Sequence, residues 1–189
     1  MKIKIFYYIF IKSILIVNNK IKFNKMEGNL SLLTKDKKIF KLSKKAGILS
    51  ELLKGMKDIP EDYEIPLPED ISSETIEKII NYLIHFNGNP PKEIAKPLYI
   101  TDMKKITDEF SADFVDKLKI EELVDIISAS HYLKINSLVN LCCAKIVSLC
   151  KGKNEEDIFK IFGVPKDYFK PEDKEKIKED NKWIDEVFQ

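Results

Sequence analysis

The run Asn-Gly-Asn-Pro-Pro at residues 87–91 constrains the fold most strongly. Glycine and asparagine adopt left-handed backbone readily and proline cannot continue a helix, so a regular element that reaches this run must end there. Before it lie Asp70 and Ser72, both candidate helix caps, and a set of apolar residues at helical spacing. These apolar residues are Ile76, Ile79, Ile80, Leu83 and Ile84. We therefore expect a helix that ends before Asn87.

Short β-type runs precede this helix. Residues 30–33 and 39–42 are apolar runs on either side of the polar residues 34–38, which predicts a hairpin although the loop has no glycine. Residues 48–53 have the spacing of a short helix that closes at Gly55. Residues 58–64 are acidic and form a loop, and residues 63–67 form a short edge-type strand because Pro66 and Pro68 cannot donate hydrogen bonds to a ladder.

Helices dominate the second half of the chain. Residues 91–106 have little pattern and suggest a linker, and order resumes at residues 110–115. Residues 120–133 predict a helix, and Ser137 is a candidate cap of the next one, which Gly152 ends. Its apolar stripe includes Leu138, Leu141 and Cys142.

Two further helices form a tail. Asn154 is a candidate cap for the first, which the Gly-Val-Pro run at residues 163–165 ends, and Pro171 suits the first turn of the second. These short helices are highly charged, yet the tail carries Phe159, Phe162, Tyr168, Phe169 and Trp183. So many aromatic side chains cannot all be buried between two short helices, so the tail predicts an exposed protein-binding surface. The chain as a whole is predicted to be α/β (α+β), with a mixed unit up to about Cys150 and then helices.

The charge is unevenly distributed. The formal net charge is +1, but residues 1–25 hold six lysines and no acid, so the remainder carries 1 − 6 = −5. An acidic body argues against nucleic acid as a partner. All 32 basic residues are lysine, which indicates coding bias rather than a set of phosphate sites.

Residues 1–25 are apolar and basic and stand outside the fold argument. Lys12 interrupts them, so neither half reaches the roughly 20 apolar residues that a membrane-spanning helix needs, and no stable membrane span is expected. Three interpretations remain open: an extension that is not part of the mature protein, with Met26 as the true start, a membrane-surface or targeting segment, or a signal peptide.

Catalytic and metal-binding patterns are weak. The sequence has no nucleotide-binding glycine motif, no Gly-x-Ser-x-Gly and no His-Glu-x-x-His. The three cysteines, Cys142, Cys143 and Cys150, suit neither a disulfide framework nor a zinc site, and buried thiols are expected. A pair of His131 with Cys142 or Cys143 is a conceivable nucleophilic site, but core packing is the better interpretation. No cofactor and no enzymatic activity are expected.

A series of short signatures in fixed order carries a family resemblance. They are Ile-Pro-Leu-Pro at 65–68, Lys-Ile-Ile-Asn-Tyr at 78–82 leading through His85 to Pro90-Pro91, Ala-Ser-His-Tyr-Leu at 129–133, Lys-Gly-Lys at 151–153 and Asp-Asn-Lys-Trp at 180–183. The series resembles the Skp family, the S-phase kinase-associated adaptors of cullin ubiquitin ligases. The resemblance implies a BTB/POZ-like part at residues 28–115 and a C-terminal helical dimerisation-type region at residues 116–189. It also implies a non-catalytic adaptor that links an F-box protein to a cullin for protein degradation. Such an adaptor is expected in the cytoplasm and nucleus, and as a homodimer when free.

The resemblance also implies two interfaces. The cullin interface falls on His131 and Tyr132, where the family has Asn followed by Tyr. The F-box interface falls on Leu138, Leu141, Ile158, Phe162, Tyr168 and Trp183. Pro171 matches a proline that some single-celled members hydroxylate and glycosylate, so it is a candidate modification site.

The change from Asn to His131 keeps a second hypothesis open. The protein could be a BTB-type self-associating or F-box-binding protein that acts outside a cullin ligase. A third hypothesis, a cysteine-based enzyme, would require reactive thiols.

Overall fold

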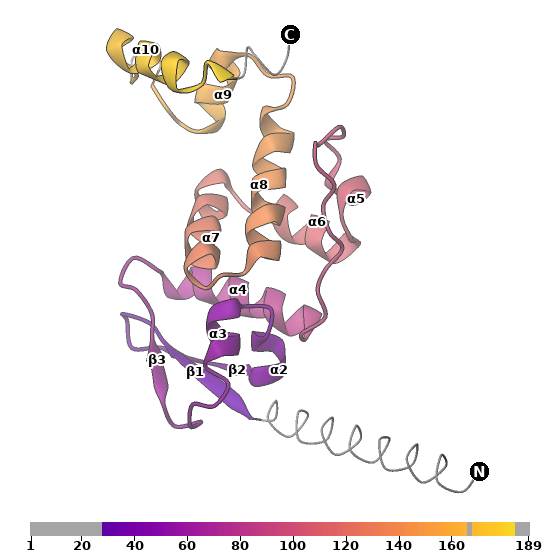
Figure 1. The fold of residues 1–189 in the computed structure, drawn as a ribbon, viewed down its shortest axis with the longest axis vertical. Coiled ribbons are helices and arrows are strands. Elements are labelled where there is room, and N and C mark those ends of the chain that lie inside the picture. Colours follow the sequence, from indigo (N-terminus) through magenta and orange to yellow (C-terminus); the bar gives the residue numbers. More distant parts are fainter. Residues whose placement is uncertain (1–27, 166–167, 184–189) are drawn as a thin grey trace, which may run out of the picture.

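A three-stranded sheet forms one end of the molecule (Figure 1). The computed structural model describes residues 28–165 and 168–183. Strands β1 (Asn29–Leu33) and β2 (Ile39–Ser43) pair antiparallel as the predicted hairpin, and β3 (Glu64–Pro66) adds in parallel to the other edge of β1. The hairpin loop manages without glycine because Lys37 adopts the left-handed conformation, with φ of 62°. The edge position of β3 confirms the expectation from its prolines.

Two short helices follow the hairpin, where a single helix was predicted. Helix α2 (Lys44–Gly47) is capped by Ser43, and α3 (Glu51–Gly55) by Ser50. The predicted helix over residues 48–53 is therefore wrong at its start, since Ile48 and Leu49 lie between the two helices. Ser50 ends the intervening turn because its hydroxyl accepts a hydrogen bond from the backbone N–H of Leu53.

Helix α4 (Ser73–Phe86) has the boundaries that the sequence predicts. Ser72 is its cap, accepting from the N–H of Thr75 at 3.1 Å, and Asn87 ends it in a left-handed conformation with φ of 43°. Four of the five predicted core positions are buried, but Ile84 is 53% exposed. Tyr82, which was not among the predicted core positions, is fully buried.

The predicted linker is better ordered than its pattern suggests. Its last residues form α5 (Met103–Ile106), with Met103 buried, and α6 (Glu109–Asp116) follows. Ile94 and Leu98 are partly buried against the hydrophobic core. This segment therefore lies on the body of the molecule.

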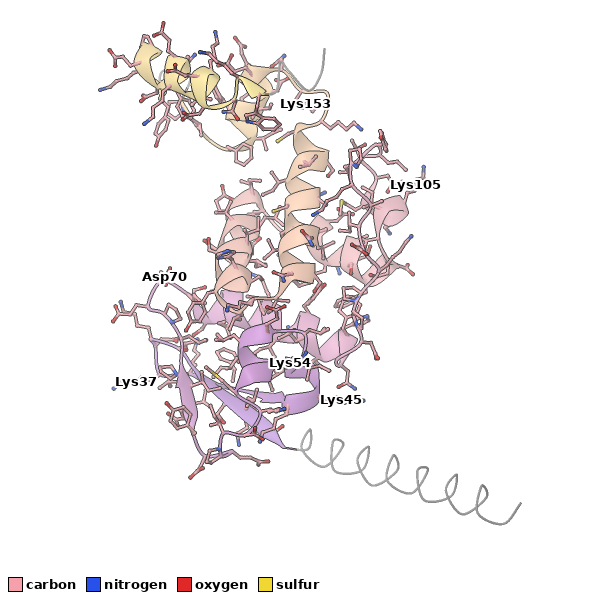
Figure 2. All side chains as sticks on the ribbon, viewed as in Figure 1. Lys37, Lys45, Lys54, Asp70, Lys105 and Lys153 are labelled. Atoms are coloured by element: carbon pink, nitrogen blue, oxygen red, sulfur yellow. The ribbon has the colours of Figure 1, made fainter. Side chains whose placement is uncertain are left out.

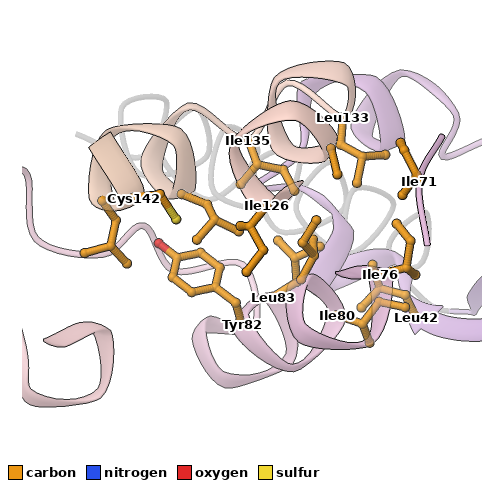
Figure 3. Packing of buried hydrophobic residues seen from close by; sticks show 14 of the residues in the cluster. Leu42, Ile71, Ile76, Ile80, Tyr82, Leu83, Ile126, Leu133, Ile135 and Cys142 are labelled. Carbon is orange, nitrogen blue, oxygen red and sulfur yellow. The ribbon is translucent and has the colours of Figure 1, made fainter. Parts of the chain in front are cut away.

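Helices α7 (Ile120–Tyr132) and α8 (Asn136–Cys150) are antiparallel neighbours. The predicted cap at Ser137 is wrong: α8 begins at Asn136, after Ile135, and has no side-chain cap. Ile135 is fully buried, so packing sets the start of this helix. Figure 3 shows side chains of α4, α7 and α8 meeting in one core, with Tyr82, Leu83, Ile126 and Ile135 among them.

The tail consists of α9 (Glu155–Ile161) and α10 (Pro171–Asp180), at the opposite end of α8 from the sheet (Figure 1). Asn154 caps α9 by accepting from the N–H of Asp157 at 2.9 Å, and Pro171 occupies the first turn of α10, both as predicted. Trp183 follows α10. All predictions for residues 1–25 fall outside the described residues. Among the helices that are described, none is long and apolar enough to cross a membrane.

Candidate interaction surfaces

The C-terminal end of α7 presents the two predicted cullin-interface residues. His131 and Tyr132 are both exposed, Tyr132 to 42%. They are the last two residues of the helix, directly before the turn into α8. Fully buried Leu133 and Ile135 follow them and anchor this turn in the core.

The turn after Tyr132 is held in place by hydrogen bonds. Lys134 is left-handed, with φ of 54°, and its N–H donates to the carbonyl of His131 at 3.1 Å. Its carbonyl accepts from the N–H of Glu51 at 3.2 Å, and the carbonyl of Leu133 accepts from the hydroxyl of buried Ser50. The start of α3 therefore fixes the backbone on which Tyr132 stands.

The tail presents the second predicted surface. Tyr168 is 65% exposed, Trp183 56% and Phe162 37%, while Ile158 is half-buried. The ring of Phe169 bridges its neighbours, with its centroid 6.0 Å from that of Phe159 and 5.1 Å, edge-on, from that of Tyr168. The structure therefore brings four of the six predicted residues to the tail, three of them exposed.

An open hollow accompanies these aromatic side chains. It has a volume of about 490 Å³ and is lined by Tyr168, Phe169, Asp173, Lys176, Ile177 and Asp180. An ion pair of 3.4 Å between Lys174 and Glu155 joins α10 to α9. A lining that combines aromatic and aliphatic side chains with charged ones is typical of a protein-binding surface.

Leu138 and Leu141 lie elsewhere. Both belong to the core, with 0% and 2% exposure. These two residues can therefore affect binding only by supporting α8 from the core. Pro171, the candidate modification site, is exposed at the start of α10, where the N–H of Lys170 donates to the carboxylate of Asp173 at 3.1 Å.

The three thiols occupy three environments. Cys142 is buried, and burial raises the pKa of its thiol to about 12, so it stays protonated at neutral pH. The prediction of buried thiols is wrong for Cys143, which is exposed. Consecutive residues on an α-helix are rotated by about 100° around its axis, so Cys143 points away from the side on which Cys142 is buried. Cys150 is half-buried. Within the described residues, no three His, Cys, Asp or Glu side chains come together as a metal site would require.

The chain is similar to known proteins over most of its length. The family model described as "Skp1 family, dimerisation domain" matches residues 136–184. The S-phase kinase-associated protein 1 homolog of Tetrahymena thermophila is 37% identical over 166 residues, covering 87% of this chain and 98% of that protein. The SCF ubiquitin ligase complex protein SKP1a of Dictyostelium discoideum is 33% identical over 162 residues, covering 83% and 96%. The Suppressor of kinetochore protein 1 of Schizosaccharomyces pombe is 28% identical over 165 residues, covering 84% and 99%.

Proposed function

Because the chain belongs to the Skp1 family, we propose that it is a non-catalytic adaptor that links an F-box substrate receptor to a cullin in an SCF ubiquitin ligase. Relatives that carry the names of SCF subunits support this role. The buried, protonated state of Cys142 speaks against a cysteine-based enzyme. An adaptor of this kind works in the cytoplasm and nucleus.

The observation that carries the proposal is the separation of the two exposed surfaces along α8. Tyr132 lies directly before this helix, and the tail begins directly after it (Figure 1). A helix of 15 residues is about 22 Å long. Two partners can therefore bind at opposite ends of α8 at the same time, as an adaptor requires.

The cullin would bind at the end of α7. Tyr132 supplies an exposed aromatic side chain at the end of α7, directly before a turn that Ser50 and Glu51 hold, so little conformational freedom is lost on binding. His131 would supply a hydrogen bond beside it. Residues 28–115 would form the BTB/POZ-like part of the family fold.

The F-box would bind in the C-terminal region, residues 116–189. Phe162, Tyr168 and Trp183 would fill its apolar pockets, and Ile158 would contribute from α9. Leu138 and Leu141 would act by supporting α8 from the core. In the absence of an F-box, the same aromatic surface would suit a homodimer.

The test is a pull-down from the source cell with three variants. Tyr132→Lys is expected to lose the cullin and keep F-box proteins, whereas Trp183→Ala is expected to weaken F-box proteins and keep the cullin. Tyr63→Lys is the matched control, since Tyr63 is 53% exposed and belongs to neither surface. Retention of both partners by both variants would contradict the assignment of the surfaces.

A second outcome would favour a different function. If the unaltered chain captures F-box proteins without any cullin, His131 in place of the family's Asn marks a divergence in cullin binding. The protein would then be an F-box-binding or self-associating protein that acts outside a cullin ligase.

A further inference from the structure

A third exposed surface lies on the segment between α4 and α5. We call it the linker patch and define it by Leu98, Tyr99 and Ile100 of this segment and Val147 of α8. Tyr99 is 80% exposed, Ile100 47% and Val147 48%. None of these residues belongs to the two surfaces proposed above.

The segment that carries the patch is fixed to α8. The Lys151 ammonium donates to the carbonyls of Leu98 at 2.9 Å and Tyr99 at 2.6 Å, and the Lys96 ammonium donates to the side chain of Asn140 at 3.2 Å. Ile94 and Leu98 pack against the core. The exposure of Tyr99 is therefore a property of an attached segment, and a partner would not have to order it first.

Two small apolar hollows flank the segment. One, of about 220 Å³, lies between the segment and α8 and is lined by Ile94, Leu98, Cys143, Ala144 and Val147 among others. The other, of about 200 Å³, lies toward α5 and includes Pro97, Tyr99, Ile100 and Ile106. Hollows of this size each suit one large side chain of a partner, rather than a whole helix or a folded domain.

The rim of the patch is basic on a body that is otherwise acidic. Lys92, Lys96 and Lys151 surround it, and no carboxylate of the described residues forms an ion pair with any of them. Lys105, visible near this edge in Figure 2, pairs with Asp102 at 3.6 Å. Glu93 is the acidic residue that lines the hollows. The local charge is thus positive, whereas residues 26–189 together carry −5.

We propose that the linker patch docks an acidic peptide segment of a partner protein through one or two aromatic or large aliphatic side chains. The apolar side chains would enter the hollows beside Tyr99, and acidic neighbours would meet Lys92 and Lys96. Apolar anchors with complementary charge at the rim give such a contact both affinity and specificity. The proposal is independent of cullin and F-box binding, because it uses a different surface.

The test measures fluorescence anisotropy of a labelled twelve-residue peptide in which Phe and Leu alternate with Glu and Asp. We expect binding by the full chain, weakened about tenfold by Tyr99→Ser and about tenfold by the double variant Lys92→Glu, Lys96→Glu. The matched controls are Tyr63→Ser and the double variant Lys54→Glu, Lys57→Glu, all at exposed positions away from the patch. Circular dichroism of each variant verifies that it is folded.

Cys143 provides a second readout that does not depend on a variant. Its exposed thiol lines the hollow between the segment and α8. We expect the acidic peptide to slow alkylation of Cys143 severalfold while Cys150, which lies outside the hollow, is unaffected.

Several results would overturn the proposal. One is equal binding of a peptide with Lys in place of Glu and Asp. Others are equal affinity for the Tyr99→Ser and Tyr63→Ser variants, or tighter binding of a single-stranded RNA oligonucleotide than of the peptide. Self-association that Tyr99→Ser abolishes would identify a second copy of the chain as the occupant and would also exclude the peptide.

Discussion

The hydroxyl of Ser50 donates a hydrogen bond to the carbonyl oxygen of Leu133, which lies 83 residues away in the sequence. Ser50 has no exposed surface, and the same hydroxyl accepts from the N–H of Leu53. One side chain therefore caps α3 and holds the turn that follows Tyr132.

Replacement of Ser50 should remove both the cap of α3 and the hydrogen bond that holds the turn after Tyr132. We expect Ser50→Ala to lower the free energy of unfolding by about 2 kcal/mol, because a cap is lost and a buried carbonyl loses its partner. Chemical denaturation measures the change. Ser72→Ala is the matched control, since exposed Ser72 caps α4 and holds no distant carbonyl, and it should cost only about 1 kcal/mol. Equal losses in the two variants would mean that the bond to Leu133 contributes nothing.

Asp36 should make the folding stability of the protein depend on pH in the acidic range. Hydrogen bonds from the hydroxyl groups of Ser73 and Thr34 hold the pKa of the Asp36 carboxyl well below its ordinary value of 3.8. The bond from Ser73 contributes more than the bond from Thr34. Because the pKa is lower in the folded protein than in the unfolded chain, the stabilisation is fully present above about pH 4 and is lost as the pH falls toward the folded pKa.

Thermal unfolding between pH 7 and pH 2 measures this contribution. We expect Ser73→Ala to lower the melting temperature at pH 7, and the difference from the unaltered protein to shrink below pH 4. Asp70→Asn serves as the control, because Asp70 is exposed and makes no hydrogen bond through its carboxylate among the described residues. A difference that stays constant down to pH 2 would show that the Ser73 contact does not depend on the charge of Asp36.

Local sequence patterns predicted the element boundaries where local chemistry decides them. Ser72, Asn154 and Pro171 each act at a helix start as expected, because their effect depends on neighbours within a few residues. Ser137 failed because burial of Ile135 sets the start of α8. The hydrogen bond from Ser50 to the carbonyl of Leu133 has no local signal, since the two residues are distant in the sequence.

The same contrast applies to the candidate surfaces. Tyr168 and Trp183 could be predicted as exposed because the tail holds more aromatic residues than two short helices can bury. The linker patch could not be predicted, because the packing of Ile94 and Leu98 against the hydrophobic core follows no periodic pattern. Exposure of Tyr99 is known only once that packing is known.

The thiols should differ in their reactivity toward an alkylating reagent. Burial raises the pKa of Cys142 from 9.0 to about 12, so it holds far less thiolate at neutral pH than an ordinary cysteine, and its burial also slows access of the reagent. We expect mass spectrometry to find Cys143 labelled first and Cys142 labelled only after unfolding. Rapid labelling of Cys142 in the folded protein would revive the hypothesis of a cysteine-based enzyme.

The hydroxyl of Tyr82 should be dispensable. The ring is fully buried against Phe86 and Phe114, at centroid distances of 4.9 and 5.6 Å, and burial raises the pKa of the phenol to about 12. Its oxygen has no hydrogen-bond partner of good geometry among the described residues, although Ser137 lies near enough to oppose the rise in pKa. We expect Tyr82→Phe to leave the free energy of unfolding unchanged or to raise it by up to about 1 kcal/mol, because a buried polar group is removed and the packing is kept.

Chemical denaturation at pH 7 tests this expectation against a size control. Tyr82→Ala should cost about 3 to 5 kcal/mol, since it removes the ring and leaves a cavity between α4, α6 and α8. If Tyr82→Phe instead costs more than about 1 kcal/mol, the hydroxyl is hydrogen-bonded in solution. A double-mutant cycle with Ser137→Ala would then identify the partner, because the two losses would not add if Ser137 supplies the bond.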